Sequence, residues 1–109
     1  MASTLKTFSP IDGSLFVERP YANSEQVRTA LTKAEHAQAA WRNTPLSERK
    51  AICSRAVDAF VADSDVIARE LCWQMGRPIQ YAANEINSFA ERSRYMIAVA
   101  DESLAPVQA

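Results

Sequence analysis

Glycine, cysteine and histidine are scarce in this sequence of 109 residues, which has two glycines, two cysteines and one histidine. Two glycines cannot form the glycine-rich loop that lets backbone N–H groups approach the pyrophosphate of a dinucleotide. One histidine without a Cys-x-x-Cys pair gives no zinc-binding set, and two cysteines give no disulfide framework. The composition therefore argues against a dinucleotide site, a zinc site and a disulfide scaffold within the chain.

A strong charge of either sign is also missing. The net charge is −1 and the pI is about 5.8, with no basic run, so we expect neither nucleic acid nor an acidic membrane surface as a partner. The first residues lack the apolar core of a signal peptide, and no apolar run approaches the ~18 residues of a membrane span. We therefore predict no membrane partner and a cytoplasmic location.

Three helices in series are predicted between residues 23 and 78. Asn23 and Gln26 form a capping pair at the start of the first helix, and Pro45 opens the second. Ser64 starts the third, and Gly76 stops it, where a left-handed residue is favoured. In each helix, apolar residues recur on one face: Val27, Ala30, Leu31, Ala34, Ala37 and Trp41; Ile52, Cys53, Ala56, Val57 and Phe60; Ile67, Ala68, Leu71, Cys72 and Met75.

Further elements are predicted on both sides of these helices. Residues 5–8 and 14–19 form a hairpin around a turn with Pro10 and Gly13. Residues 78–101 form the fourth and longest helix, with Pro78 in its first turn. We therefore predict a mainly α fold of four helices with a small N-terminal β-hairpin. Its segments are the hairpin at 1–22, a helical part at 23–102 and a tail or linker at 103–109.

The order of these turns and caps resembles one family. It consists of Ser9-Pro10-Ile11-Asp12-Gly13, Trp41-Arg42, Thr44-Pro45-Leu46-Ser47-Glu48-Arg49, Gly76-Arg77-Pro78 and Glu85-Ile86. Together they are similar to the N-terminal helical region of the NAD(P)-dependent aldehyde dehydrogenases. The resemblance implies a fragment of an α/β enzyme several times longer. That parent would oxidise an aldehyde to a carboxylic acid through a cysteine thiohemiacetal, with NAD or NADP as its cofactor.

No catalytic residue of that family can be assigned to this chain. The family's nucleophile lies in a Gly-Gln-x-Cys context, its base in Glu-Leu-Gly-Gly and its oxyanion-hole asparagine in Pro-Trp-Asn, and none of the three contexts is present. Cys53 and Cys72 lie on apolar helical lines, so we predict buried thiols rather than nucleophiles. His36 lies off its apolar stripe and is predicted to be solvated. Catalytic, cofactor-binding and metal-binding residues are therefore all predicted to be absent, and the chain alone is predicted to be inactive.

A monovalent-cation site is a weaker alternative. Some members of the family bind such a cation through strand carbonyls and a helix acid, which here points to Thr7, Phe8 and Glu85. The match is imperfect, because the usual acid aligns with Ile86. In the competing interpretation, Glu85 forms an ion pair with Arg77 or is solvated. Glu85 and Arg92 then lie on a face of the fourth helix other than its apolar stripe.

The apolar residues exceed what a chain of this size can hide. Trp41, Trp73, Tyr81, Phe89 and Tyr95 are predicted to pack in the core or between helices rather than to bind an aromatic ligand. Trp73 and Met96-Ile97 are expected to be exposed or buried against another copy. We therefore predict self-association, as a dimer through the long fourth helix or a higher oligomer.

Two functions of different class remain at this level. In the first, the chain is the N-terminal part of an NAD(P)+-dependent aldehyde dehydrogenase and acts as scaffolding. In the second, it is a stand-alone helical interaction module whose apolar faces close on one another. Neither hypothesis gives the chain catalytic activity of its own.

Overall fold

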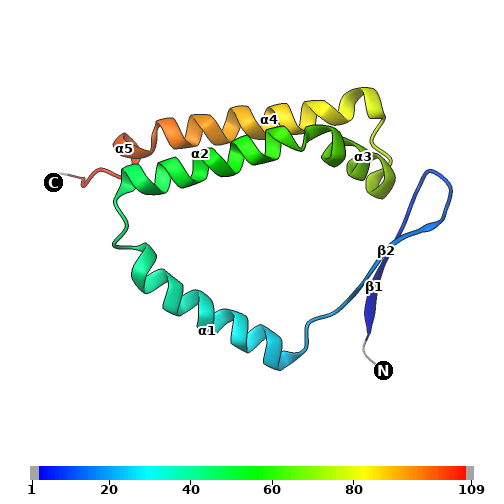
Figure 1. Cartoon of the computed structure of the whole chain (residues 1–109), viewed down its shortest axis with the longest axis horizontal. Coiled ribbons are helices and arrows are strands. Elements are labelled where there is room, and N and C mark those ends of the chain that lie inside the picture. Colours follow the sequence, from blue (N-terminus) through cyan, green and yellow to red (C-terminus); the bar gives the residue numbers. More distant parts are fainter. Residues whose placement is uncertain (1–2, 108–109) are drawn as a thin grey trace.

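The computed structural model describes residues 3–107, which form a two-stranded hairpin followed by five helices. The elements are β1 (Thr4–Phe8), β2 (Leu15–Pro20), α1 (Ser24–Trp41), α2 (Leu46–Ala62), α3 (Ser64–Met75), α4 (Ile79–Ala98) and α5 (Ala100–Ser103), as labelled in Figure 1. The predicted fold class, mainly helical with a small N-terminal hairpin, is confirmed.

The hairpin is antiparallel and pairs Thr4 with Pro20 at its open end, with an irregularity between Thr7 and Phe8. Its turn is built from local hydrogen bonds: the Ser9 N–H donates to the Ser14 carbonyl and the Gly13 N–H to the Ser9 carbonyl, each at 2.8 Å. Gly13 has a φ of 75°, which glycine adopts without the steric cost of a Cβ atom.

The start of α1 and the end of α3 lie where the sequence predicts them, and the start of α2 lies one residue away from its predicted position. Asn23 and Gln26 form a reciprocal capping box, in which each side chain accepts from the other residue's N–H at 2.8 Å. Gly76 ends α3 in the left-handed conformation, with a φ of 71°. Pro45 precedes the first residue of α2 rather than occupying it, which moves the predicted start by one position.

The fourth helix is not continuous to residue 101 as predicted. Val99 has φ −85° and ψ 0°, and its N–H is directed at the carbonyls of both Tyr95 and Ile97. This tightened last turn ends α4, and the chain continues as the short α5. Lys50 of α2 pairs with Asp101 of α5, so the start of α2 contacts the far end of the helical layer.

The buried core lies where α4 packs on α2 and α3. Its apolar members are small or branched: Val57, Ala68, Ala82, Ile86 and Ala90. Small side chains let the helix axes approach, which suits ridge-and-groove packing. An ion pair between Arg94 Nη2 and Asp58 Oδ1, at 2.8 Å, joins α4 to α2 on their solvent side. This core is too small to cover the apolar faces of all the helices.

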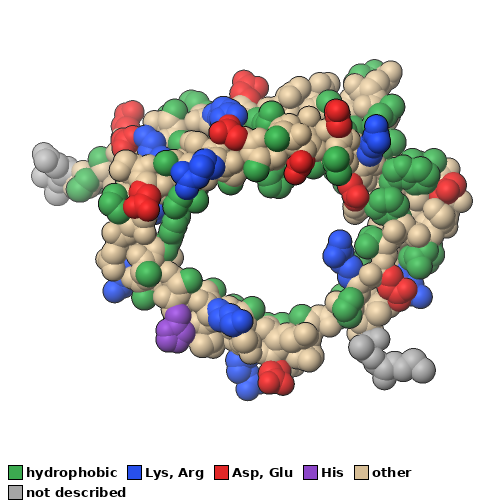
Figure 2. All heavy atoms as spheres, in the orientation of Figure 1, with side chains coloured by type: hydrophobic (Ala, Val, Ile, Leu, Met, Phe, Trp, Pro, Cys, Tyr) green, Lys and Arg blue, Asp and Glu red, His purple; other side chains and the backbone are tan. Residues whose placement is uncertain are grey.

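The helix α1 stands apart from this core, and every one of its residues is exposed. Figure 2 shows an opening through the molecule, bordered by α1, the α2–α4 layer and the hairpin. The radius of gyration of 18.9 Å is well above the ~13 Å of a compact domain of this length. The chain is therefore an open frame rather than a closed globule.

Candidate functional site

An apolar groove runs between α2 and α4, and we call it the α2/α4 groove. It has a volume of about 420 Å³ and is lined by side chains of both helices: Cys53, Ala56, Val57, Phe60, Phe89, Arg92, Ser93, Met96 and Ile97. In this lining the rings of Phe60 and Phe89 meet at a centroid distance of 5.0 Å and a tilt of 42°. Aromatic pairs favour such tilted contacts. The pair still leaves 51% of Phe60 and 43% of Phe89 exposed.

A smaller hollow adjoins the α2/α4 groove at the same phenylalanine pair. It has a volume of about 100 Å³ and is lined by Phe60, Ile67, Leu71, Glu85, Ile86 and Phe89. Glu85 and Arg92 therefore both border an apolar surface. Both side chains are exposed, as predicted, although they border an apolar face of α4 that is wider than the stripe read from the sequence.

The two thiols are less buried than predicted. Cys53 is exposed and Cys72 is half-buried. Cys53 lies on the apolar stripe of α2 as expected, but that stripe borders the open groove rather than a filled core. Its neighbours in the groove lining are mainly apolar, and none of these described residues is a histidine or a carboxylate that could act as its base. His36, by contrast, is exposed as predicted.

The carboxylate of Glu85 is engaged by a cation of its own chain. Arg77 Nη2 lies 2.7 Å from Glu85 Oε1, which is the ion pair proposed as the alternative to cation binding. Thr7 and Phe8 lie in β1 and pair with Val17 and Leu15 of β2. Within residues 3–107, no group of three or more histidine, cysteine or acidic side chains could hold a metal ion.

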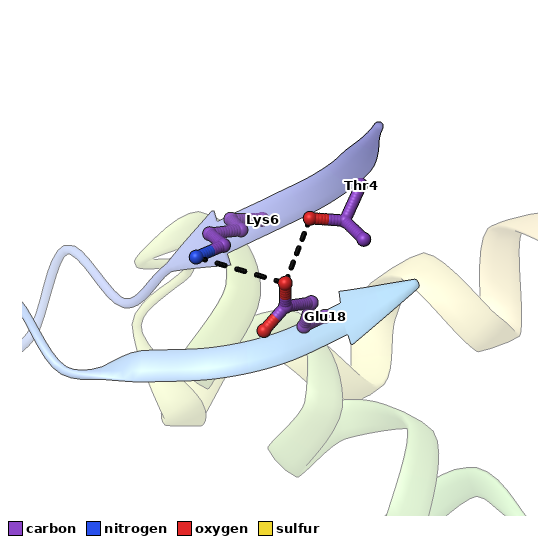
Figure 3. A network of polar contacts seen from close by, with 3 residues as sticks. All are labelled: Thr4, Lys6 and Glu18. Carbon is purple, nitrogen blue, oxygen red and sulfur yellow. Dashed lines mark hydrogen bonds and ion pairs between the residues drawn. The ribbon is translucent and has the colours of Figure 1, made fainter. Parts of the chain in front are cut away.

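The polar network of the hairpin is shown in Figure 3. Thr4 Oγ1 donates to Glu18 Oε1 at 2.7 Å, and Lys6 Nζ lies 3.6 Å from the same oxygen. All three side chains are on the exposed surface of the hairpin. Exposed pairs of this kind contribute at most about 1 kcal/mol. The network therefore joins the two strands.

Asp12 in the hairpin turn has a lowered pKa. Its Oδ1 accepts hydrogen bonds from the Ser14 hydroxyl at 2.7 Å and the Ser14 N–H at 2.9 Å. These bonds favour the ionised carboxylate and lower the pKa of Asp12 below its usual value. This is the pattern of an Asx-type turn, so the shift has a structural cause.

The hairpin also contacts the end of α3. Phe16 of β2 stacks on Trp73 of α3 with a centroid distance of 6.2 Å and an interplanar angle of 6°. Pro10 in the turn lies against Gly76, where a Cβ atom would come within 3.0 Å of Pro10 Cγ. The sequence does not indicate which residues make this contact, because its partners are more than fifty positions apart in the chain.

The predicted aromatic packing is confirmed only in part. Trp73 and Phe89 each contact another ring, but both remain partly open, and the exposure of Trp73 agrees with its prediction. Trp41, Tyr81 and Tyr95 are exposed. Met96 is 62% exposed, in agreement with the prediction that it lies on an open face. Ile97, beside it, is half-buried.

Both glycines lie at turns. Gly76 lies at the C-terminal end of α3, where free carbonyl groups would repel a phosphate. Gly13 lies in the hairpin turn and not at the start of a helix. Among the described residues, neither glycine therefore forms a turn at the start of a helix. No described helix is long and apolar enough to cross a membrane.

Two proteins with similar sequences are semialdehyde dehydrogenases. The chain is 30% identical to glutarate-semialdehyde dehydrogenase of Pseudomonas putida, over 84% of the chain and 20% of that protein. It is 30% identical to N-succinylglutamate 5-semialdehyde dehydrogenase 1 of Caulobacter vibrioides, over 93% of the chain and 21% of that protein. The chain thus spans about a fifth of the length of these relatives.

A solved structure has the same arrangement of elements. It is the crystal structure of PnpE in complex with nicotinamide adenine dinucleotide, which matches with a TM-score of 0.84 and 28% identity. The match covers 98% of this chain and 23% of PnpE. The sequence model of the aldehyde dehydrogenase family matches residues 1–108. Because this match covers nearly the whole sequence, the chain belongs to the aldehyde dehydrogenase family.

Proposed function

We propose that this chain is the N-terminal part of an NAD(P)+-dependent aldehyde dehydrogenase and that it has a scaffolding role there. The parent enzyme oxidises an aldehyde to a carboxylic acid, with NAD or NADP as hydride acceptor and a cysteine outside this chain as nucleophile. The hairpin at 1–22 and the helical part at 23–102 position the parent's other segments. The tail at 103–109 links to them.

The open frame is the observation that carries this proposal. The frame leaves α1 and the α2/α4 groove uncovered, yet it matches PnpE with a TM-score of 0.84. The contacts within this chain do not close the frame, yet the same arrangement occurs in a much longer chain. This is typical of elements that pack on other parts of a fold. The competing hypothesis, a stand-alone module, requires helical faces that close on one another, and these faces are open.

The chain by itself is proposed to be inactive. The described lining around Cys53 offers no base, and neither glycine lies at the start of a helix. The named relatives are semialdehyde dehydrogenases, which makes glutarate semialdehyde and N-succinylglutamate 5-semialdehyde suitable first substrates for the parent. We also propose a cytoplasmic location and self-association of the isolated chain, on the basis of its exposed apolar residues.

The test begins with the coding sequence that follows Ala109 in the source DNA. If it continues in frame, both the longer product and the 109-residue chain are purified and assayed for reduction of NAD+ and NADP+ with these semialdehydes. We expect activity from the longer product and none from the chain. Reduction by the chain alone would contradict the scaffolding role. A stop codon after Ala109, with a compact and stable product, would favour the interaction module.

A further inference from the structure

The chain exposes far more surface than a compact protein of its mass. Its accessible surface is 8925 Å². A compact monomer of 12.1 kDa exposes only about 6,000 Å², so the excess is about 2,900 Å². One partner in a standard protein–protein interface contributes about 800 Å². The excess is therefore large enough for an interface of the size found in permanent complexes.

Two apolar surfaces contribute to this excess. The first is the α2/α4 groove, in which Met96 is 62% exposed. The second is the apolar face of α1, on which Leu31 is 66% exposed. Towards the end of α1 lies a further hollow of about 590 Å³, lined by Ala34, Ala37, Gln38, Ala40, Trp41 and Thr44. Both surfaces are open in the described part of the chain.

We propose that this chain binds the remainder of its parent enzyme, the residues after position 109, without a covalent link to it. The binding surface consists of the apolar face of α1 and the α2/α4 groove. The inference rests on the proposed function, which assigns these uncovered faces to later segments of the parent. It adds that the surface itself holds the two parts together, so that the chain can act as a separate subunit of the enzyme.

The comparison with a longer chain favours the remainder as the partner. This chain matches PnpE with a TM-score of 0.84 over 98% of its own residues, but over only 23% of PnpE. More than three quarters of the longer chain therefore lies outside the match. Protein interiors are close-packed, so an open frame of this kind is expected to be covered by the rest of such a chain. A second copy would only repeat the same open faces.

The binding surface is formed before the partner arrives. The helices α2, α3 and α4 share a buried core of their own, and an ion pair joins Arg94 to Asp58 at 2.8 Å. The hairpin is attached to α3 by the stack of Phe16 on Trp73. Binding to elements that are already ordered loses little conformational entropy. The open faces can therefore associate with a partner without refolding of the frame.

The tail is a suitable place to break the link between the two parts. Leu104 is 64% exposed and Val107 is 96% exposed. Residues 104–107 belong to no helix or strand. Exposed segments of this kind tolerate insertion and proteolytic cleavage. A cut after Val107 therefore disturbs no residue of the described core.

The experiment places a specific protease site after Val107 in the longer product, which is purified intact and then cut. Size-exclusion chromatography and the reduction of NAD+ and NADP+ with the semialdehydes named above are measured before and after cleavage. A fluorescently labelled 109-residue chain is then added to the cut and the uncut product. The label is also placed on Leu31→Glu, on Met96→Glu and on the matched control Val66→Glu. Val66 is 62% exposed and lines neither the groove nor the hollow of α1.

We expect the two pieces to elute together and to keep most of the activity. The labelled chain should exchange into the cut product and not into the uncut product, where its position is occupied. Leu31→Glu and Met96→Glu should bind at least ~100-fold more weakly, because each buries a charge without a partner, whereas Val66→Glu should bind like the unmodified chain. Circular dichroism should show equal helix content for all four labelled chains, since none of these residues is in the buried core.

Four results would overturn the inference. Pieces that separate after cleavage, from an uncut product that is active, exclude this binding and leave the proposed function in place. Folded Leu31→Glu and Met96→Glu chains that exchange as well as Val66→Glu exclude these two surfaces. A labelled chain that binds the uncut product equally well binds somewhere else. A stop codon after Ala109, or an inactive uncut product, removes the proposed function and this inference together.

Discussion

Gly76 is the residue whose replacement best tests how the hairpin is held to the helices. It ends α3 with a φ of 71°, and Pro10 of the hairpin turn lies directly against it. Replacing Gly76 with alanine changes two things at once. It places a Cβ atom in the left-handed region, and it brings that atom against the pyrrolidine ring of Pro10.

The two effects have separate magnitudes. The left-handed conformation costs an alanine about 1–2 kcal/mol. The 3.0 Å approach to Pro10 Cγ is shorter than an ordinary carbon contact, and overpacking of this kind adds about 1–2 kcal/mol. Gly13 is the matched control, because it has a φ of 75° and no atom lies within 4 Å of the point that an alanine Cβ would occupy. We therefore expect Gly76→Ala to destabilise by about 2–4 kcal/mol and Gly13→Ala by about 1–2 kcal/mol.

Urea unfolding followed by tryptophan fluorescence measures both values. Trp73 stacks on Phe16, so its emission reports whether the hairpin is docked, and a Trp41→Phe background removes the second tryptophan. Introducing Pro10→Ala should reduce the cost of Gly76→Ala to about that of Gly13→Ala. Equal costs for the two glycine variants, or no effect of Pro10→Ala, would show that the hairpin does not contact Gly76 in solution.

Three further predictions concern local features. Phe16→Ala should shift the emission of Trp73 towards that of a solvated indole and cost about 1 kcal/mol beyond the lost area, as measured by urea unfolding. Asn23→Ala should destabilise α1 by about 1 kcal/mol, seen as faster amide exchange in its first turn. Because the pKa of Asp12 is lower in the folded hairpin than in the unfolded chain, the ionised Asp12 stabilises the hairpin at pH values above the unfolded pKa. This contribution is lost as the pH falls through the folded pKa. An NMR titration in which Asp12 has its ordinary pKa would contradict the prediction.

The parts of the fold that could be read from the sequence are those set by neighbouring residues. The capping box of Asn23 and Gln26 needs only residues three positions apart, and the stop at Gly76 needs only one residue that tolerates a positive φ. The helical periodicity likewise depends on spacing alone. Each of these features is therefore present in the structure where the sequence placed it.

The errors arise where the outcome depends on distant partners. Cys53 was predicted to be buried because it lies on an apolar stripe, but a stripe shows only which side of a helix is apolar and not whether anything covers it. The surface shared by Glu85 and Arg92 depends on how α2 and α3 pack beside α4. The break at Val99 is an error of another kind, because it arises from a local tightened turn that no proline or glycine marks.

The isolation of α1 has a consequence for how this sequence can evolve. Its 18 residues form a rod about 27 Å long, which fixes the separation between the hairpin and the start of α2. Inserting or deleting one residue would rotate everything beyond it by about 100° and shift it by about 1.5 Å. Substitutions on the surface of the rod disturb no contact in the described core. Selection on this frame should therefore conserve the length of α1 more strictly than the identity of its solvent-facing residues.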